Sequence, residues 1–252
     1  MRSVRPYIAI HENVIGFDMA LLLSLLGDLY DIVKLRVAPA RNGFAFIRRP
    51  RNYFILTLRG VTKAGNLQAI YDRVSSHFAD YDVSGWPSWV WRASRSELLE
   101  EENRARRTAR SEPLAAPSSD WAYLLSQKQR DTLKAAEVAW ADKYGSSAQT
   151  DPLCVFDLSQ SIERLSISRG MLPTLRTQSE RLWSPMQKRW MTFAERLACM
   201  GYPVYSDLAA AARVPIDTIS PKGPRFSVGN AMHVANLGII VLVVLSGCDF
   251  PG

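Results

Sequence analysis

Three short apolar runs near the start of the chain constrain its fold more than any other feature. They cover residues 7–10, 32–37 and 53–58, and each is rich in aliphatic, β-branched or aromatic side chains. Runs of this length and composition predict buried strands. Residues 17–29, rich in leucine, predict a helix between the first two runs, and Asn42-Gly43 predicts a turn before the third. The start of the chain therefore predicts a β-α-β-β segment of an α/β sheet.

The composition changes after this segment. Trp86, Trp89 and Trp91 form a cluster, residues 92–110 are strongly charged, and residues 111–119 are rich in Pro, Ser and Ala. We expect the tryptophans to pack in a core, with a base-stacking platform as the alternative. The charged stretch predicts a solvated helix face, with a helix that tracks phosphates as the alternative. The Pro/Ser/Ala stretch predicts a linker or an exposed loop.

Helical patterns return further along the chain. Residues 131–143 are rich in alanine and predict a helix, whereas residues 150–188 predict short strands and loops. Thr192, followed three residues later by Glu195, forms a capping box that starts another helix, so we expect both residues to be structural. The last apolar segment, 230–245, predicts a closing helix.

Four local patterns follow one another in a fixed order. In chain order they are Glu12-Asn13-Val14, Arg49-Pro50-Arg51-Asn52-Tyr53, Arg189-Trp190-Met191-Thr192-Phe193-Ala194-Glu195 with Met200-Gly201-Tyr202-Pro203, and Gly229-Asn230-Ala231-Met232. Each pattern alone is common. Their order, with a long insert between the second and the third, is far more specific than any one of them.

This order resembles the C-terminal part of the DNA cytosine-5-methyltransferase family. That family places Glu-Asn-Val after its fifth strand and Gln-x-Arg-x-Arg before its seventh. A variable target-recognition region follows, and then a Thr-x-x-Glu…Gly-Phe-Pro helix and a Gly-Asn-Ala/Ser-Val helix. The resemblance covers residues 5–58 and about 175–246. Ile47 stands where the family has glutamine, which removes one polar contact of the pattern.

The resemblance implies an α/β fold. It would be a partial Rossmann-like S-adenosylmethionine-dependent methyltransferase sheet, comprising the last three strands, with an inserted irregular α+β recognition region. We therefore expect residues 1–61 to form a partial catalytic domain and residues 62–188 a variable target-recognition-like region. Residues 189–252 would form helices that return to the catalytic domain.

The resemblance also implies roles for four polar residues. Glu12 matches the glutamate that contacts N3 and the exocyclic amine of a cytosine flipped out of the duplex. Asn13 would fix the strand end through side-chain hydrogen bonds. Arg49 and Arg51 match the two family arginines, one of which would orient Glu12 and the flipped base or its phosphate. Without the other motifs, Glu12 also fits a solvated turn residue, and the arginines, with Arg48, fit a surface charge cluster.

The cofactor implied is S-adenosylmethionine. Asn230 matches a family residue near this cofactor, Gly229 would allow close approach of the backbone, and Ala231 completes the motif.

Other parts of the family's chemistry have no counterpart in this sequence. The family places a Phe-x-Gly-x-Gly-type loop, an acidic residue for the cofactor ribose and a Pro-Cys nucleophile before its Glu-Asn-Val. Too few residues precede Glu12 to hold them. None of Cys154, Cys199 and Cys248 follows a proline or lies near Glu12, so we nominate none as the nucleophile. We expect the chain to be a fragment that is inactive alone, and a chain supplying the missing N-terminal half is a candidate partner.

Charge and composition narrow the partners and the compartment. The chain has 31 basic and 24 acidic residues, for a net charge of +7, and 24 of the basic residues are arginine. Arginine suits bidentate contacts with anions, which is compatible with DNA. The 3 cysteines and 3 histidines are scattered, so we expect no disulfide scaffold and no metal site. The sequence shows no secretory signal and no apolar run of about 20 residues, so we expect no membrane span. The expected location is intracellular, and nuclear if the source is eukaryotic.

Three functions stay open at this point. The leading hypothesis is the C-terminal part of a DNA (cytosine-5-)-methyltransferase. The alternative is a non-catalytic module that binds DNA or a methyltransferase, which the missing nucleophile favours. A basic α+β scaffold protein unrelated to the family is the third. The target DNA sequence and the oligomeric state do not follow from the sequence.

Overall fold

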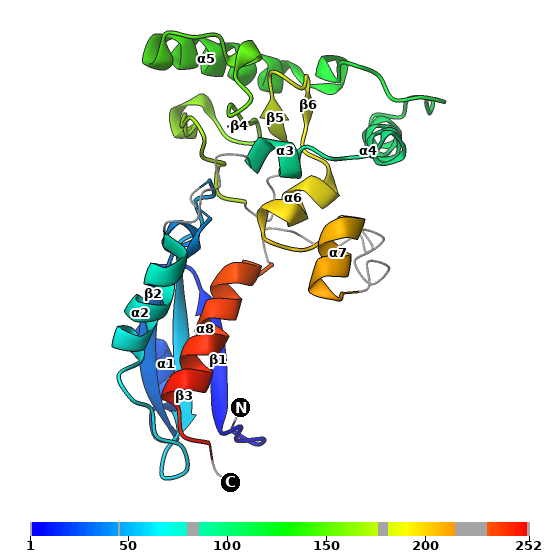
Figure 1. Ribbon diagram of the computed structural model, residues 1–252. Helices are drawn as coiled ribbons and strands as arrows, with labels where there is room; N and C mark the ends of the chain where they lie inside the picture. The colour runs from blue at the N-terminus through cyan, green and yellow to red at the C-terminus, as the bar shows by residue number, and fades with distance from the viewer. Residues whose placement is uncertain (1, 45, 80–85, 176–180, 215–230, 251–252) are drawn as a thin grey trace. The chain divides into compact units, whose positions relative to one another are not determined.

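The chain divides into two units, each formed by its own set of helices and strands. The computed structural model describes residues 2–44, 46–79, 86–175, 181–214 and 231–250 (Figure 1). Unit 1 comprises Met1–Val83 together with Met232–Gly252, and unit 2 comprises Ser84–Ala231. Unit 2 is therefore inserted in the sequence between the two segments that form unit 1.

Unit 1 is a small α/β unit. Its elements in chain order are β1 (Ile8–Asn13), α1 (Met19–Leu26), β2 (Tyr30–Val37), the 3-10 helix η1 (Pro39–Asn42), β3 (Arg51–Leu58), α2 (Leu67–Ala79) and α8 (Val234–Gly247). The predicted β-α-β-β order is confirmed. The ends of the elements differ from the sequence-based expectation by a few residues.

The sheet of unit 1 has the strand order β1-β3-β2. β3 is antiparallel to both neighbours, so β1 and β2 run in the same direction with β3 between them. The expectation of a mixed α/β structure is confirmed. The strands that pair directly in the described sheets are all antiparallel.

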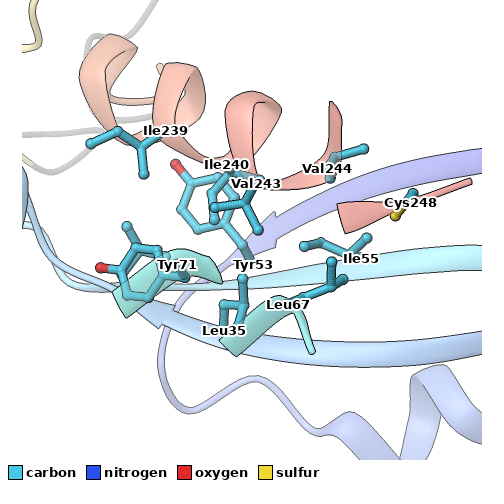
Figure 2. Close-up of a cluster of buried hydrophobic side chains, with 11 residues drawn as sticks. Leu35, Tyr53, Ile55, Leu67, Tyr71, Ile239, Ile240, Val243, Val244 and Cys248 are labelled. Atoms are coloured by element: carbon cyan, nitrogen blue, oxygen red, sulfur yellow. The ribbon is translucent and has the colours of Figure 1, made fainter. Parts of the chain in front are cut away.

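Helices cover both faces of this sheet. α1 packs on one face against Tyr30, Phe54 and Leu56. On the other face α2 and α8 enclose the larger core, in which Tyr53 of β3 and Ile240 of α8 are fully buried (Figure 2). Successive side chains of β3 thus point to opposite faces of the sheet and pack in different cores, because side-chain direction alternates along a strand.

Local hydrogen bonds set the true ends of the elements. β1 continues past residue 10 because its ladder with β3 continues to Asn13, which lies opposite Asn52. α1 begins at Met19 because the Asp18 side chain accepts a hydrogen bond from the Ala20 N–H, and it ends before Gly27. The predicted ends of β1 and α1 were a few residues off because an apolar pattern contains no information on capping side chains or on strand partners.

Unit 2 is mainly helical, with a small antiparallel sheet of order β4-β5-β6. Its elements are α3 (Trp86–Val90), α4 (Arg95–Thr108), η2 (Ala122–Leu124), α5 (Gln127–Tyr144), η3 (Ala148–Thr150), β4 (Phe156–Asp157), η4 (Ile162–Arg164), β5 (Leu182–Ser184), β6 (Arg189–Trp190), α6 (Phe193–Cys199) and α7 (Ser206–Ala212). One buried cluster of unit 2 includes the tryptophans Trp121, Trp140, Trp183 and Trp190.

Several expectations for unit 2 can be compared with this structure. The Thr192–Glu195 capping box is present at the start of α6. Trp86 is buried, which agrees with a core role. The charged stretch forms α4. Residues 150–188 hold short strands and loops as predicted, apart from 176–180, which lie outside the described residues.

The division into units differs from the expected domain boundaries. α2 packs in unit 1, although its residues were expected in the variable region. α6 and α7 belong to unit 2, whereas α8 belongs to unit 1. The reason is packing, because the apolar side chains of α2 and α8 share one core with the sheet.

Candidate base-binding site

Glu12 and Arg51, which come from two separate motifs, lie together in unit 1. Glu12 of β1 is directly opposite Tyr53 of β3, and Arg51 is two residues earlier on the same face of β3. Arg51 Nε lies 3.3 Å from Glu12 Oε1, and the two side chains are 14% and 11% exposed. The ladder between β1 and β3 therefore places a carboxylate and a guanidinium in contact at the carboxyl end of β1.

The carboxylate of Glu12 retains hydrogen-bonding capacity. Its Oε1 is buried and has no hydrogen-bond partner among the described residues, because the approach of Arg51 is close without hydrogen-bond geometry. Buried carboxylate oxygens in folded proteins nearly always accept hydrogen bonds. This oxygen can thus accept a hydrogen bond from an N–H group of a ligand.

Two asparagines hold the loop after Glu12. Asn13 Oδ1 accepts a hydrogen bond from the Val14 N–H at 2.8 Å. Asn52, opposite Asn13 on β3, is 1% exposed and donates from Nδ2 to the Ile15 carbonyl at 2.9 Å. Asn13 was expected to fix the strand end through its side chain, and this role stays a prediction. Asn52 was not selected from the sequence, although a buried asparagine within an apolar strand was the available signal.

Arg49 is buried at the entry to β3 and is 2% exposed. Its charge acts on His233, the residue that caps α8. Burial, with a smaller contribution from Arg49, lowers the pKa of His233 to about 3. Of the two arginines that match the motif, Arg51 is seen in contact with Glu12, and the charge of Arg49 acts at the start of α8.

The start of α8 carries a polar cluster that sequence reasoning missed. His233 Nδ1 accepts a hydrogen bond from the Asn236 backbone N–H, and Asn236 Oδ1 accepts one from Asn42 Nδ2 at 2.8 Å. His233, Asn236 and Asn42 are all at most 2% exposed. No local pattern links Asn42 with Asn236, which lie 194 residues apart in the sequence.

The proposed cofactor residues are only partly described. Gly229 and Asn230 lie outside the described residues, and Ala231 is buried just before the cap of α8. The described part of the chain thus offers one of the three residues, and the assignment of S-adenosylmethionine rests on the motif.

The three cysteines are poor nucleophiles. All are buried and free. Burial raises the pKa of Cys154, of Cys199 and of Cys248, so their thiols are protonated near neutral pH. Cys154 and Cys199 belong to unit 2, and Cys248 follows the last turn of α8.

Thr192 and Glu195 have a structural explanation. Glu195 is fully buried and accepts hydrogen bonds from both terminal nitrogens of Arg189, each at 2.7 Å, and from the Thr192 N–H at 2.8 Å. Its acceptor capacity is used within unit 2, so neither residue belongs to a reactive site.

No helix among the described residues has both the length and the apolar character needed to cross a membrane. The same residues contain no cluster of three or more His, Cys, Asp or Glu side chains able to hold a metal ion.

Comparison with known proteins gives no family assignment. No protein-family model matches the chain, and no curated protein sequence matches it. The methyltransferase resemblance therefore depends on the four motifs and on where their residues lie.

Proposed function

We propose that this chain is the C-terminal part of a DNA (cytosine-5-)-methyltransferase. The observation that carries the proposal is the contact between Glu12 and Arg51 at 3.3 Å, with Glu12 Oε1 buried and lacking a hydrogen bond in the described chain. Two motifs about 40 residues apart were expected to meet at a flipped base. Glu12 and Arg51 do lie together and are mostly buried, and one carboxylate oxygen of Glu12 lacks a hydrogen bond, which supports that function.

The chemistry assigns distinct tasks to the residues. Addition of a thiolate to C6 of cytosine makes C5 electron-rich, and a hydrogen-bonded acid at N3 limits the build-up of charge on the ring. Glu12 would accept a hydrogen bond from the exocyclic amine and, when protonated, donate one to N3, and Arg51 would fix the orientation of Glu12. S-adenosylmethionine supplies the methyl group when bound. The thiolate must come from a Pro-Cys loop that this sequence lacks.

The strands of unit 1 are compatible with the same proposal. The resemblance makes β1, β2 and β3 the last three strands of a methyltransferase sheet, and the three do form one sheet, in the order β1-β3-β2.

Exposed apolar surface supports a partner that supplies the N-terminal half. In the described sheet β1 pairs only with β3, so its other edge is open. Leu21 and Leu25 on α1 and Leu242 and Leu245 on α8 are between 47% and 60% exposed. A helix that is apolar on all sides is typical of a fully buried position. The partner we propose would cover these surfaces and bring the nucleophile.

The DNA part of the proposal is supported by arginine placement. Arg107, in the last turn of α4, and Arg110, just after this helix, are exposed and form no ion pair with a described residue. Guanidinium groups that are not neutralised by carboxylates are available to phosphates. Arg104, by contrast, pairs with Glu101.

Methyl transfer to DNA tests the proposal directly. Incorporation of tritiated methyl groups would be measured for the chain alone and for the chain mixed with or joined to an N-terminal half of the family. We expect activity only in the second case. Glu12→Gln should abolish the restored activity and leave DNA affinity almost unchanged, because the carboxyl acts on the flipped base and not on the phosphates. Asp31→Asn, which breaks the exposed pair with Arg59, is the control. Full activity of Glu12→Gln would contradict the role of Glu12.

A non-catalytic DNA-binding or methyltransferase-partner module is the second candidate. The raised pKa values of the three buried thiols favour it for the chain by itself. DNA binding without methyl transfer in either arm of the assay would support this module.

A further inference from the structure

Two buried side chains in the first turn of α8 have nitrogen atoms without partners. His233 is 1% exposed and Asn236 is 0% exposed. Neither His233 Nε2 nor Asn236 Nδ2 has a hydrogen-bond partner in the described part of the chain. A buried donor without an acceptor is destabilising, and here two such donors lie within one turn at the N-terminus of a helix, where a ligand oxygen could accept from both.

The hydrogen bonds of His233 define its protonation. Its Nδ1 accepts the hydrogen bond of the Asn236 N–H, so the single ring proton of the neutral imidazole is on Nε2. Burial, with a smaller contribution from Arg49, lowers the pKa of His233 to about 3, which keeps the ring neutral near pH 7. His233 Nε2 is therefore a hydrogen-bond donor.

Asn236 contributes a second donor. Its Oδ1 is occupied by the hydrogen bond from Asn42 Nδ2 at 2.8 Å, which leaves its own amide group to donate. The ring of Phe44 lies edge-on to His233, with 4.9 Å between the ring centroids, and forms an apolar wall beside it.

The electrostatics around these donors favour a negative charge. They lie at the N-terminus of α8, a helix of 14 residues, where backbone N–H groups and the helix dipole attract anions. The guanidinium of Arg49 acts on His233 from the segment before β3. Two neutral donors, a helix N-terminus and a nearby cation are the elements of an oxyanion site.

We propose that the first turn of α8 binds a small oxyanion, such as inorganic phosphate or the carboxylate of a small molecule. His233 Nε2 and Asn236 Nδ2 donate hydrogen bonds to its oxygens, and Arg49 contributes positive charge. The buried donors of His233 and Asn236 define this site whether or not the proposed methyltransferase function holds, although it directly follows the Gly229-Asn230-Ala231-Met232 motif.

Titration of the full chain with anions tests the site. The imidazole nitrogens of His233 would be followed by long-range ¹H–¹⁵N NMR, with phosphate, acetate and chloride added in separate series at equal ionic strength. We expect a saturable shift of the His233 Nε2 signal with phosphate or with acetate, and none with chloride. The series that saturates identifies the class of oxyanion. The absence of a saturable shift in both series, or an equal shift with chloride, would overturn the proposal.

A substitution of His233 can separate its role as the helix cap, through Nδ1, from its proposed role as an anion donor, through Nε2. Asn is a good helix N-cap, so His233→Asn keeps an acceptor for the start of α8 while removing the Nε2 donor. We expect its anion affinity, measured by the anion-dependent rise in melting temperature, to fall by about tenfold or more, since a hydrogen bond to a charged group is lost. His77→Asn, on the exposed side of α2, is the matched control and should bind as the unaltered chain does. Equal affinity in His233→Asn would exclude the assigned donor.

Discussion

Arg189 and Glu195 form a bidentate ion pair in the interior of unit 2. Both terminal nitrogens of Arg189 lie 2.7 Å from the two carboxylate oxygens of Glu195. The side chains are 10% and 0% exposed. Because Glu195 also accepts the Thr192 N–H that starts α6, this pair ties β6 to the first turn of the next helix.

Glu195→Gln should therefore destabilise the chain strongly. The substitution leaves the charge of Arg189 buried without its counter-ion, a change that costs about 3–5 kcal/mol in other proteins. Asp207→Asn is the control, because its pair with Arg92 is exposed to solvent and should contribute little to stability. Urea unfolding monitored by tryptophan fluorescence would measure both free energies. Equal losses for the two variants would show that burial does not decide the contribution of these pairs.

The lowered pKa of His233 predicts that the stability of the chain depends on pH. Its pKa of about 3 in the folded chain lies below the value of about 6.5 in the unfolded chain, so the unfolded state binds more protons between these values. The free energy of unfolding therefore does not change with the protonation of His233 above a pH of about 6.5, and it decreases as the pH falls from there toward 3. The shift corresponds to at most about 5 kcal/mol. Thermal unfolding of unit 1 from pH 7 to pH 4 should show this loss, and His233→Asn should reduce its slope. An unchanged slope would assign the pH dependence to other groups.

The sequence predicted the elements of unit 1 because their signals are local. The apolar runs that became β1, β2 and β3 are short and β-rich, and each could be recognised without knowledge of its neighbours. The start of α8 was placed too early. Its true first residue depends on the capping contact of His233, which is a property of the folded chain.

Only those residues of the candidate site that belong to a sequence motif could be predicted. Glu12 and Arg51 were selected from two motifs, and the strand register brings them together. Their catalytic roles stay predictions. His233 and Asn236 follow no pattern, and their polar cluster depends on a contact with Asn42 across 194 residues of sequence. Such a contact exists only after α8 returns to unit 1.

The Glu12–Arg51 pair should be coupled energetically. Arg51→Met leaves the carboxylate of Glu12 mostly buried without its cation and should cost about 1–3 kcal/mol. Adding Glu12→Gln removes the charge that caused this cost, so the double variant should lose less than the sum of the single losses. Urea unfolding of the four proteins gives a coupling energy, expected at about 0.5–3 kcal/mol. Strictly additive losses would mean that the two groups do not interact in solution.

Two glycines of α8 should respond to the same substitution in opposite directions. Gly238 is exposed, and a Cβ there would meet no atom within 4 Å. Gly238→Ala should therefore stabilise the chain by about 0.5–1 kcal/mol, since alanine loses less conformational entropy in a helix. At Gly247 a Cβ would lie 2.6 Å from both Ile70 Cδ1 and Leu67 Cδ2 of α2. Because these side chains must move to admit it, Gly247→Ala should destabilise by about 1 kcal/mol or more.

Thermal and urea unfolding of both alanine variants would measure the difference. Its sign depends on the approach of α2 to the end of α8, where the Gly65 N–H donates to the Gly247 carbonyl at 2.8 Å. Helix propensity alone would make the two changes equal and both stabilising. A gain in stability for Gly247→Ala similar to that for Gly238→Ala would therefore contradict close packing of α2 against the end of α8. Opposite signs would confirm that α2 and α8 share one core, as the buried position of Leu67 requires.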